Sequence, residues 1–310
     1  MIRAELDALP VSEANSSLEY RSLTGNSHLC GHDGHCAVLA GALLLTLDHA
    51  EEIPSDCAVR FLFQPAEEKG AGAALMIEKG ALEGVSEAWA LHNTPFEPEG
   101  GVFGRAGPIS AGSIRVTLQY SEGKEGGDPL LALCEVNVLI NERMNEIFGE
   151  ENDRSVIFTF LKFSEENDES RNPRVASMGG SCRFLKSSLE EPFVELLKKT
   201  CDEVAKKRGV EPKLTLVSGY PIIVNNDQLI KDLGNVVEVI DKYFPMPMGD
   251  DFSYYALKVP GCYFSFGTGK GPNNHSEGYD FKDQFIERAS RLWFRVISNQ
   301  LRENSAISSN

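Results

Sequence analysis

Metal-ligating side chains are concentrated in one short segment of the chain, HLCGHDGHC, which covers residues 28–36. The thiol of Cys30 stands two residues before the imidazole of His32. Thiolate and imidazole ligands suit zinc or another borderline ion such as manganese, cobalt or nickel, and a thiolate can also bridge two ions. Further donors occur along the chain at Glu67, Glu68, His92 and His275. These residue types indicate a metal site assembled from several segments.

The same segment has a plainer interpretation, in which its side chains bind no metal. A Cys-Gly-His turn is common in proteins, and histidines such as His28 and His35 more often cap a backbone segment or support a neighbour. We expect five of the six histidines in turns or strand-end segments of the first domain, next to Gly, Asn, Asp or Ser, where side chains can converge on an opening. The residues alone leave both interpretations open.

Adjacent carboxylates in QPAEE, residues 64–68, form a second candidate site. Like charges side by side are costly unless a cation or a raised pKa accommodates them. One carboxylate could bind a metal ion while the other works as a base. Alternatively, Glu67 and Glu68 form the acidic first turn of the helix that follows, where the helix dipole favours them. Local sequence favours this second interpretation.

The elements around these residues alternate between apolar strands and helical patterns, which predicts an α/β domain. AVRFLF (58–63) and EAWALH (87–92) are candidate buried strands, and AGAALMIEKG (71–80) suits a short helix that ends at a glycine. QPAEE and His92 therefore lie at strand ends, where the sites of open α/β sheets collect.

The middle of the chain has a different pattern. Strands are expected at residues 113–120, 155–163, 181–185 and 214–220, and helices at 129–148 and 189–208. The resulting order, β-α-β-β-α-β, is the ferredoxin-like split βαβ arrangement. We therefore expect a metal-binding domain of residues 1–112 plus 222–310, interrupted by an inserted domain of residues 113–221.

Composition excludes several classes of partner. Thirty basic and 46 acidic residues give a formal charge of -16, which disfavours nucleic acid and anionic membranes as partners. No apolar run reaches the roughly 20 residues that cross a bilayer. The first ten residues lack the apolar core of a signal peptide, so we expect a cytoplasmic protein. Seven scattered cysteines argue for reduced thiols or a metal role rather than a disulfide framework.

Seven sequence segments follow one another along the chain in the same order as the motifs of a known enzyme family. They are RAELDALPVSE, HLCGHDGHCAVLAGALLL, FLFQPAEEKGAGAALMIEKG, ALHNTPFEPEGGVFGRAGPISAG, GYPIIVNND, MGDDFSYY and NNHSEGYDF. The chain thereby resembles the aminoacylase/carboxypeptidase-type metal amidohydrolases, and within them the hippurate hydrolases, indole-acetyl-amino-acid hydrolases and N-acetyl-diaminopimelate deacetylases. The resemblance implies a metallopeptidase-like, mixed-sheet α/β catalytic domain with an inserted lid domain.

The resemblance also implies a dinuclear centre of two divalent transition-metal ions, zinc or manganese, with cobalt and nickel as alternatives. Cys30 matches a thiolate that bridges both ions. Glu68 and His275 match the ligands of one ion, and His32 and His92 match the ligands of the other.

Roles next to the ions are implied in the same way. Glu67 matches the general base that takes a proton from metal-activated water and returns it to the leaving amine. Asp7 matches an aspartate that orients a ligand, and Asp33 and His35 match structural positions. The implied substrates are N-acyl amino acids or related amides, and homodimerisation through the inserted domain is a habit of the family.

Two features depart from the family pattern. The segment that family members carry before the RADMD-like strand is absent, so we expect a catalytic domain shortened at its N-terminus. Either the chain is a fragment or has a wrongly predicted start, or the catalytic domain has lost part of one face and exposes apolar surface. SEGKEGGDP (121–129) lacks the histidine of the family's Gly-Gly-His segment, which helps bind the substrate and stabilise the oxyanion. The loss of one oxyanion donor typically costs about 10² to 10³ in rate. Asn172 and Arg183 match a lid asparagine and arginine, or are simply a turn residue and a surface strand residue.

These departures leave an alternative function open. The chain could be an inactive relative that keeps the metal site or only the fold and serves as a binding protein. An ordinary peptidase of the same fold is less favoured, because the Cys-Gly-His form of the motif resembles the amidohydrolase branch.

Overall fold

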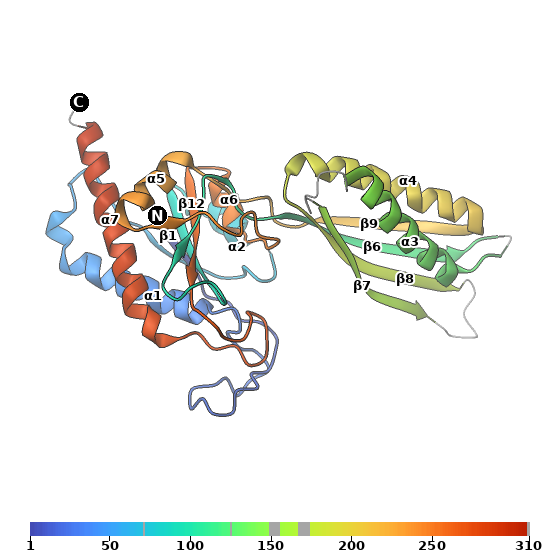
Figure 1. Ribbon diagram of the computed structural model, residues 1–310, viewed down its shortest axis with the longest axis horizontal. Coiled ribbons are helices and arrows are strands. Elements are labelled where there is room, and N and C mark those ends of the chain that lie inside the picture. The colour runs from blue at the N-terminus through green and yellow to red at the C-terminus, as the bar shows by residue number, and fades with distance from the viewer. Residues whose placement is uncertain (71, 125, 149–155, 167–173, 309–310) are drawn as a thin grey trace. The chain divides into compact units, whose positions relative to one another are not determined.

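A computed structural model describes residues 1–308 except residues 71, 125, 149–155 and 167–173. The chain divides into two compact units, which are visible in Figure 1. The first unit consists of Met1–Ile109, Ile223–Phe244 and Asp250–Asn310, and the inserted unit of Ser110–Ile222 and Pro245–Gly249. The sequence placed these divisions at residues 112/113 and 221/222 and assigned the short segment 245–249 to the first domain.

Six strands form the mixed sheet of the first unit, in the order β11-β4-β12-β3-β1-β2. Their bounds are β1 Ile2–Glu5, β2 Phe61–Gln64, β3 Ala88–Thr94, β4 Val102–Phe103, β11 Val239–Ile240 and β12 Gly261–Gly267. Strands β1, β2, β3 and β12 run parallel to one another, whereas β4 is antiparallel to β12. The carboxyl ends of four strands therefore lie along the same edge of the sheet.

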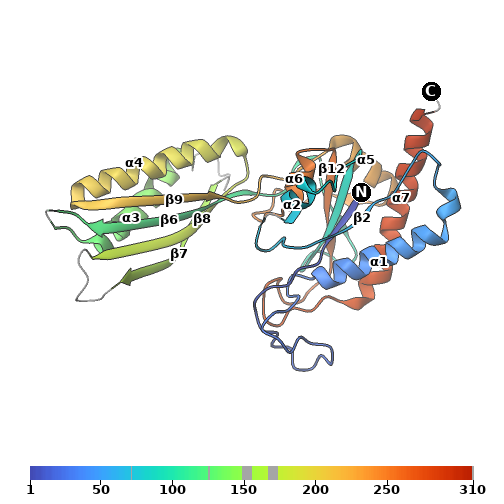
Figure 2. The ribbon, with the colours of Figure 1, turned by 180° about the vertical axis from the view of Figure 1, so that it is seen from behind.

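Helices cover both faces of this sheet. Helices α1 (His32–Asp48), α5 (Asp227–Val236) and α7 (Ile286–Ser308) share one core cluster, and α2 (Gly72–Glu78) and α6 (Phe252–Ala256) share another. In Figure 2, α1 and α7 lie on the same side of the sheet. Strand β3 is buried on both faces, because Trp89 packs in the first cluster and Ala90 in the second. This explains its continuous apolar run.

Shorter elements complete the first unit. They are the antiparallel pair β5 (Gly107–Pro108) and β10 (Val224–Asn225) and the 3-10 turns η1 (Ala50–Glu52) and η3 (Asp283–Phe285). Helix α2 ends as predicted, since Gly80 adopts a φ of 88° and its N–H donates to the carbonyl of Ile77. No helix in the described parts of the chain is long and apolar enough to cross a membrane.

The inserted unit is a four-stranded antiparallel sheet, β7-β8-β6-β9, with two helices. Its elements are β6 Gly112–Glu122, α3 Pro129–Phe148, β7 Val156–Glu166, β8 Val175–Phe184, η2 Ser187–Leu189, α4 Glu190–Arg208 and β9 Val210–Ser218. The order β-α-β-β-α-β agrees with the predicted pattern. Strand β8 begins six residues earlier than the expected strand at 181–185.

Alternation of buried residues shows which face of this sheet meets α3 and α4. On β6, Ile114, Val116, Leu118 and Tyr120 are buried and share one core cluster with both helices. Arg183 lies on the opposite face of β8, next to the buried Cys182 and Phe184. Asn172 lies outside the described residues.

Candidate metal centre

The predicted ligands meet at the edge where the parallel strands end. Glu67 and Glu68 follow β2, and His92 lies near the end of β3. Cys30 comes two residues before α1, whose first residue is His32. His32 and His35 were expected in a turn, and this expectation is wrong because Gly31, with a φ of 92°, lets the helix begin directly after it. The helix start directs these side chains toward the strand ends.

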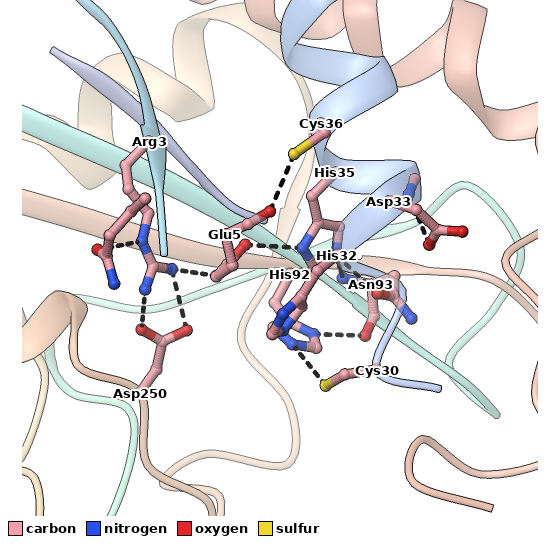
Figure 3. Close-up of polar contacts among 12 residues, drawn as sticks. Arg3, Glu5, Cys30, His32, Asp33, His35, Cys36, His92, Asn93 and Asp250 are labelled. Carbon is pink, nitrogen blue, oxygen red and sulfur yellow. Dashed lines mark hydrogen bonds and ion pairs between the residues drawn. The ribbon is translucent and has the colours of Figure 1, made fainter. Parts of the chain in front are cut away.

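Two groups of donors share the thiol of Cys30. Cys30, His32 and His92 form one group, and Cys30, Glu68 and His275 form the other, with the ligand atoms of each group within 4.8 Å of one another. The Sγ atom of Cys30 lies 3.5 Å from Nε2 of His92 and 3.3 Å from Nε2 of His275. Figure 3 shows Cys30, His32 and His92 converging. The structure therefore brings together all five candidate ligands, Cys30, His32, Glu68, His92 and His275.

Hydrogen bonds at Nδ1 fix how two imidazoles face this space. Nδ1 of His92 donates to the carbonyl of Asn93 at 2.8 Å. Nδ1 of His32 lies 3.0 Å from the carbonyl of Asp7 and 3.4 Å from its carboxylate. The buried Nε2 of His32 has no hydrogen-bond partner among the described residues. Both rings thus present Nε2 toward the shared thiol, as metal-ligating histidines do.

Asp7 holds two parts of the site at once. Besides contacting His32, its carboxylate accepts a hydrogen bond of 2.9 Å from the backbone N–H of Glu68. Burial alone would lower the pKa of His32, but the hydrogen bond to Asp7 and the charge of Glu5 raise it overall. Asp7 therefore ties the segment after β2 to the start of α1.

His275 reaches the site through backbone contacts with the Cys30 segment. Its N–H donates to the carbonyl of Leu29 at 2.7 Å, and the amide of Asn274 donates to the carbonyl of Cys30 at 2.7 Å. His275 has a φ of 68°, in the left-handed region, which is costly for a non-glycine residue. Tertiary contacts therefore impose this geometry.

The pKa shifts of the candidate ligands and of Glu67 indicate a site that a bound cation would stabilise. Burial, and then the negative charge of Glu68, raise the pKa of the Cys30 thiol well above its ordinary value. Burial and the charge of Asp250 likewise raise the pKa of Glu67 well above its ordinary value. Burial lowers the pKa of His92 to about 3, which leaves it in the neutral form that binds metals. A bound divalent ion would reverse the penalty on the thiolate and carboxylates. The residues therefore fit two ions that share Cys30.

The helix-turn interpretation of the paired glutamates is wrong. Helix α2 begins at Gly72 and has no acidic residue in its first turn. Glu67 is 7% exposed and lies with His32 and Glu68 in a third group of close donor atoms. Glu67 lies at the site rather than on the helix because β2 ends at Gln64 and α2 begins only at Gly72.

A buried charge cluster behind the donors was missed by the sequence reasoning. Arg3 forms ion pairs with Glu5, with Asp250 at 2.9 Å and with Asp251 at 2.6 Å, and its Nε donates to Gln64 at 2.9 Å. Burial would raise the pKa of Glu5, but Arg3 and His35 hold it well below its ordinary value. Burial raises the pKa of Asp250 to about 7 despite Arg3. The sequence signal for this cluster was the presence of Arg3 and Glu5 in a short buried strand, because buried charges need partners of opposite charge.

The segment that lacks the expected histidine serves a structural role in its described residues. Asp128 accepts a hydrogen bond of 2.9 Å from the N–H of Leu131 and so caps α3. All six histidines of the chain, His28, His32, His35, His49, His92 and His275, belong to the first unit. The imidazoles of the site therefore come from the first unit alone.

Fold and site together define the class of protein. A mixed-sheet α/β unit with thiol, imidazole and carboxylate donors at its strand ends, interrupted by a ferredoxin-like unit, is the arrangement of a metallopeptidase-like hydrolase. Residues 1–299 match Peptidase family M20/M25/M40, and the chain belongs to this family. It is thus a metal-dependent amidohydrolase or peptidase of the aminoacylase type.

Individual relatives support this assignment. The chain is 28% identical to the N-acetyl-L-cysteine deacetylase of Bacillus subtilis, over 98% of this chain and 74% of the relative. It is 28% identical, with the same coverage, to an IAA-amino acid hydrolase of Arabidopsis thaliana. A crystal structure of a dinuclear metal binding peptidase from the M20 family of Bacillus subtilis superimposes with a TM-score of 0.82 at 26% identity, covering 97% of this chain and 80% of that chain.

Proposed function

We propose that this chain hydrolyses the amide bond of N-acyl amino acids at a dinuclear metal centre. The observation that carries the proposal is the pair of donor groups that share the Sγ atom of Cys30. One ion would be held by Glu68 and His275 and the other by His32 and His92, with Cys30 common to both. The substrate class is supported by relatives whose names specify N-acetyl-L-cysteine and an IAA-amino acid.

Each residue then has a task in the reaction. Bound divalent ions lower the pKa of water from about 15.7 to about 7 and polarise a carbonyl group. Glu67, buried beside the donors, would accept a proton from the attacking water and return it to the nitrogen of the departing amino acid. Asp7 would keep His32 oriented and hold the Glu68 backbone in place. Zinc or manganese suits the mixed sulfur, nitrogen and oxygen donors, with cobalt and nickel as alternatives.

The adjacent glutamates offer a matched pair of variants for the test. Glu67→Gln should keep close to two metal ions per chain but lose about 10²- to 10⁴-fold in kcat, because only the proton transfer is removed. Glu68→Gln should lose metal as well as activity. Glu78→Gln, an exposed position on α2, serves as the control. Metal content is measured by mass spectrometry, and turnover on a panel of acetyl, benzoyl and indole-acetyl amino acids.

Two outcomes would contradict the proposal. Undiminished hydrolysis by Glu67→Gln would refute the assigned base. A metal-loaded wild type without chelator-sensitive turnover on any member of the panel would favour the alternative, a non-catalytic relative that keeps the metal site as a binding protein. The absence of a histidine from SEGKEGGDP is the observation behind this alternative.

We also propose that the chain forms a homodimer through the inserted unit. Helix α3 exposes Leu131, Cys134 and Val138 at spacings that place them along one face. Light scattering after size exclusion should give twice the chain mass for the wild type. Leu131→Glu with Val138→Glu should give the monomer, and an unchanged dimer would exclude this surface.

A further inference from the structure

Asn93 contacts three of the segments that supply the proposed ligands. It directly follows His92 and accepts the Nδ1 hydrogen bond of that ring on its own carbonyl. Its Oδ1 lies 2.6 Å from Nε2 of His35, one turn along α1 from His32. Its Nδ2 donates to the hydroxyl of Tyr279 at 2.5 Å. Asn93 is 1% exposed, so these contacts are shielded from water.

The Cys30–His32 turn rests directly on the Asn93 and Tyr279 side chains. A Cβ atom at Gly31 would lie 2.5 Å from Oδ1 of Asn93 and 2.9 Å from the hydroxyl of Tyr279. Both distances are shorter than any comfortable contact, so the turn has no space to move toward β3. Gly31 also needs its φ of 92°, which a side chain at this position would oppose.

His35 extends this support to the buried charge cluster. Its Nδ1 donates to Glu5 at 2.8 Å, and Glu5 pairs with Arg3, which in turn pairs with Asp250 at 2.9 Å. Figure 3 shows the His35 ring between Glu5 and Asn93, with a dashed line to each. His35, which contacts the amide of Asn93, therefore cannot shift without breaking its buried contact with Glu5.

We propose that Asn93 is a positioning residue for the metal centre, which holds the Cys30–His32 turn at its distance from His92. The inference rests on the proposed function, because it assumes that these three side chains bind metal. Removal of the amide would leave Nε2 of His35 with only the backbone N–H of residue 93, at 3.1 Å, and would leave the hydroxyl of Tyr279 without this partner. It would also open space beneath Gly31. The turn would then relax, and Cys30 would no longer be held against the imidazole of His92.

Cobalt titration of the metal-free protein tests this role without any substrate. Thiolate-to-cobalt absorption in the near ultraviolet reports whether Cys30 is a ligand, and its titration gives the affinity. Asn93→Ala should bind cobalt about 10- to 100-fold more weakly, with a weakened thiolate band, as is typical when a residue that orients metal ligands is removed. Asn93→Asp, which keeps an oxygen for both His35 and Tyr279, should restore most of the affinity and the band.

Asn225 provides a matched control for loss of a buried amide. It is 2% exposed, its Nδ2 donates to the carbonyl of Tyr263 at 2.7 Å, and its Oδ1 accepts from the N–H of Tyr263 at 2.8 Å. Asn225→Ala should reduce the melting temperature of the metal-free protein but leave cobalt affinity unchanged. Tyr279→Phe, which deletes only the hydroxyl, is a milder second variant if Asn93→Ala fails to fold, and it should also lower cobalt affinity.

The outcomes separate the inference from the function on which it rests. A wild type without a thiolate-to-cobalt band would contradict the proposed metal centre itself. If the wild type shows the band, and Asn93→Ala or Tyr279→Phe binds cobalt with the same affinity and the same spectrum as the wild type, only the positioning role is overturned. Equal affinity losses in Asn93→Ala and Asn225→Ala would also overturn it, because they would show a general effect of stability.

Discussion

The two units of this protein differ in what they bury. The first unit buries the charged side chains of Arg3, Glu5, Asp250 and Asp251 beneath the proposed metal centre. In the described part of the inserted unit, the buried polar residues are only Ser110 and Thr200. The inserted unit therefore depends on apolar packing, whereas the first unit maintains costly buried charges next to its candidate site. Such charges are weak contributors to stability but are sensitive to the loss of a partner.

This difference predicts how each unit responds to substitution. In the first unit, a substitution that breaks the buried charge network should lower the free energy of unfolding by more than the volume of the lost side chain suggests. In the inserted unit, the cost should follow the volume removed from the core. Both tryptophans, Trp89 and Trp293, lie in the first unit, so their fluorescence follows that unit alone, while far-ultraviolet circular dichroism follows both.

Arg3→Met is expected to have the largest effect on stability. It leaves Glu5, Asp250 and Asp251 buried without their shared counter-charge, which typically costs about 3 to 5 kcal/mol. Urea unfolding of the metal-free protein, followed by tryptophan fluorescence, measures the loss in the first unit. A loss below about 1 kcal/mol would show that the cluster is not the vulnerable part of this unit.

Leu197→Ala tests the apolar core of the inserted unit. Leu197 is fully buried between α4 and the inserted sheet, and truncation of such a leucine costs about 2 to 5 kcal/mol through lost burial and a residual cavity. The dichroism transition should move to lower urea while the tryptophan transition stays in place. Coincident shifts of both transitions would show that the two units unfold as one, and the comparison between them would then fail.

The inserted unit was also the part that the sequence predicted in most detail. Its strands bury alternate residues, as β6 does from Ile114 to Tyr120, and α4 ends at Gly209 in the left-handed conformation. These are local patterns with periods of two and 3.6 residues, so local sequence reveals them. The order of its elements followed directly.

The candidate site was predictable only in part, for a physical reason. Residue types and strand ends indicated Cys30, His32 and His92, but no local pattern shows that His275 pairs with the backbone of Leu29. The contacts of Asn93 with His35 and Tyr279 likewise join separate segments. Such long-range hydrogen bonds leave no periodicity in the sequence.

Glu97→Gln should change how the stability of the first unit depends on pH. Glu97 is 5% exposed, and burial raises its pKa from 4.5 to about 7, against a smaller opposing effect of Ser265. Because the folded state holds this proton more tightly, the contribution of Glu97 to stability should be most favourable below the unfolded pKa and should be lost as pH rises toward 7. Between about pH 5 and pH 8 the wild type should lose about 2 to 3 kcal/mol more than Glu97→Gln. Parallel pH profiles in tryptophan-monitored unfolding would contradict this expectation.

Glu135→Gln in the inserted unit should give the smallest effect and the opposite sign. Hydrogen bonds from Lys207 and Arg208, each at 2.5 Å, lower the pKa of Glu135. Its contribution is therefore present above the unfolded pKa and is lost on acidification. Lys207 is largely exposed, so the loss at neutral pH should stay below about 1 kcal/mol and shrink with added salt. Dichroism-monitored unfolding at low and high salt measures it. A larger, salt-insensitive loss would mean that the inserted unit also depends on a desolvated ion pair, as the first unit does around Arg3.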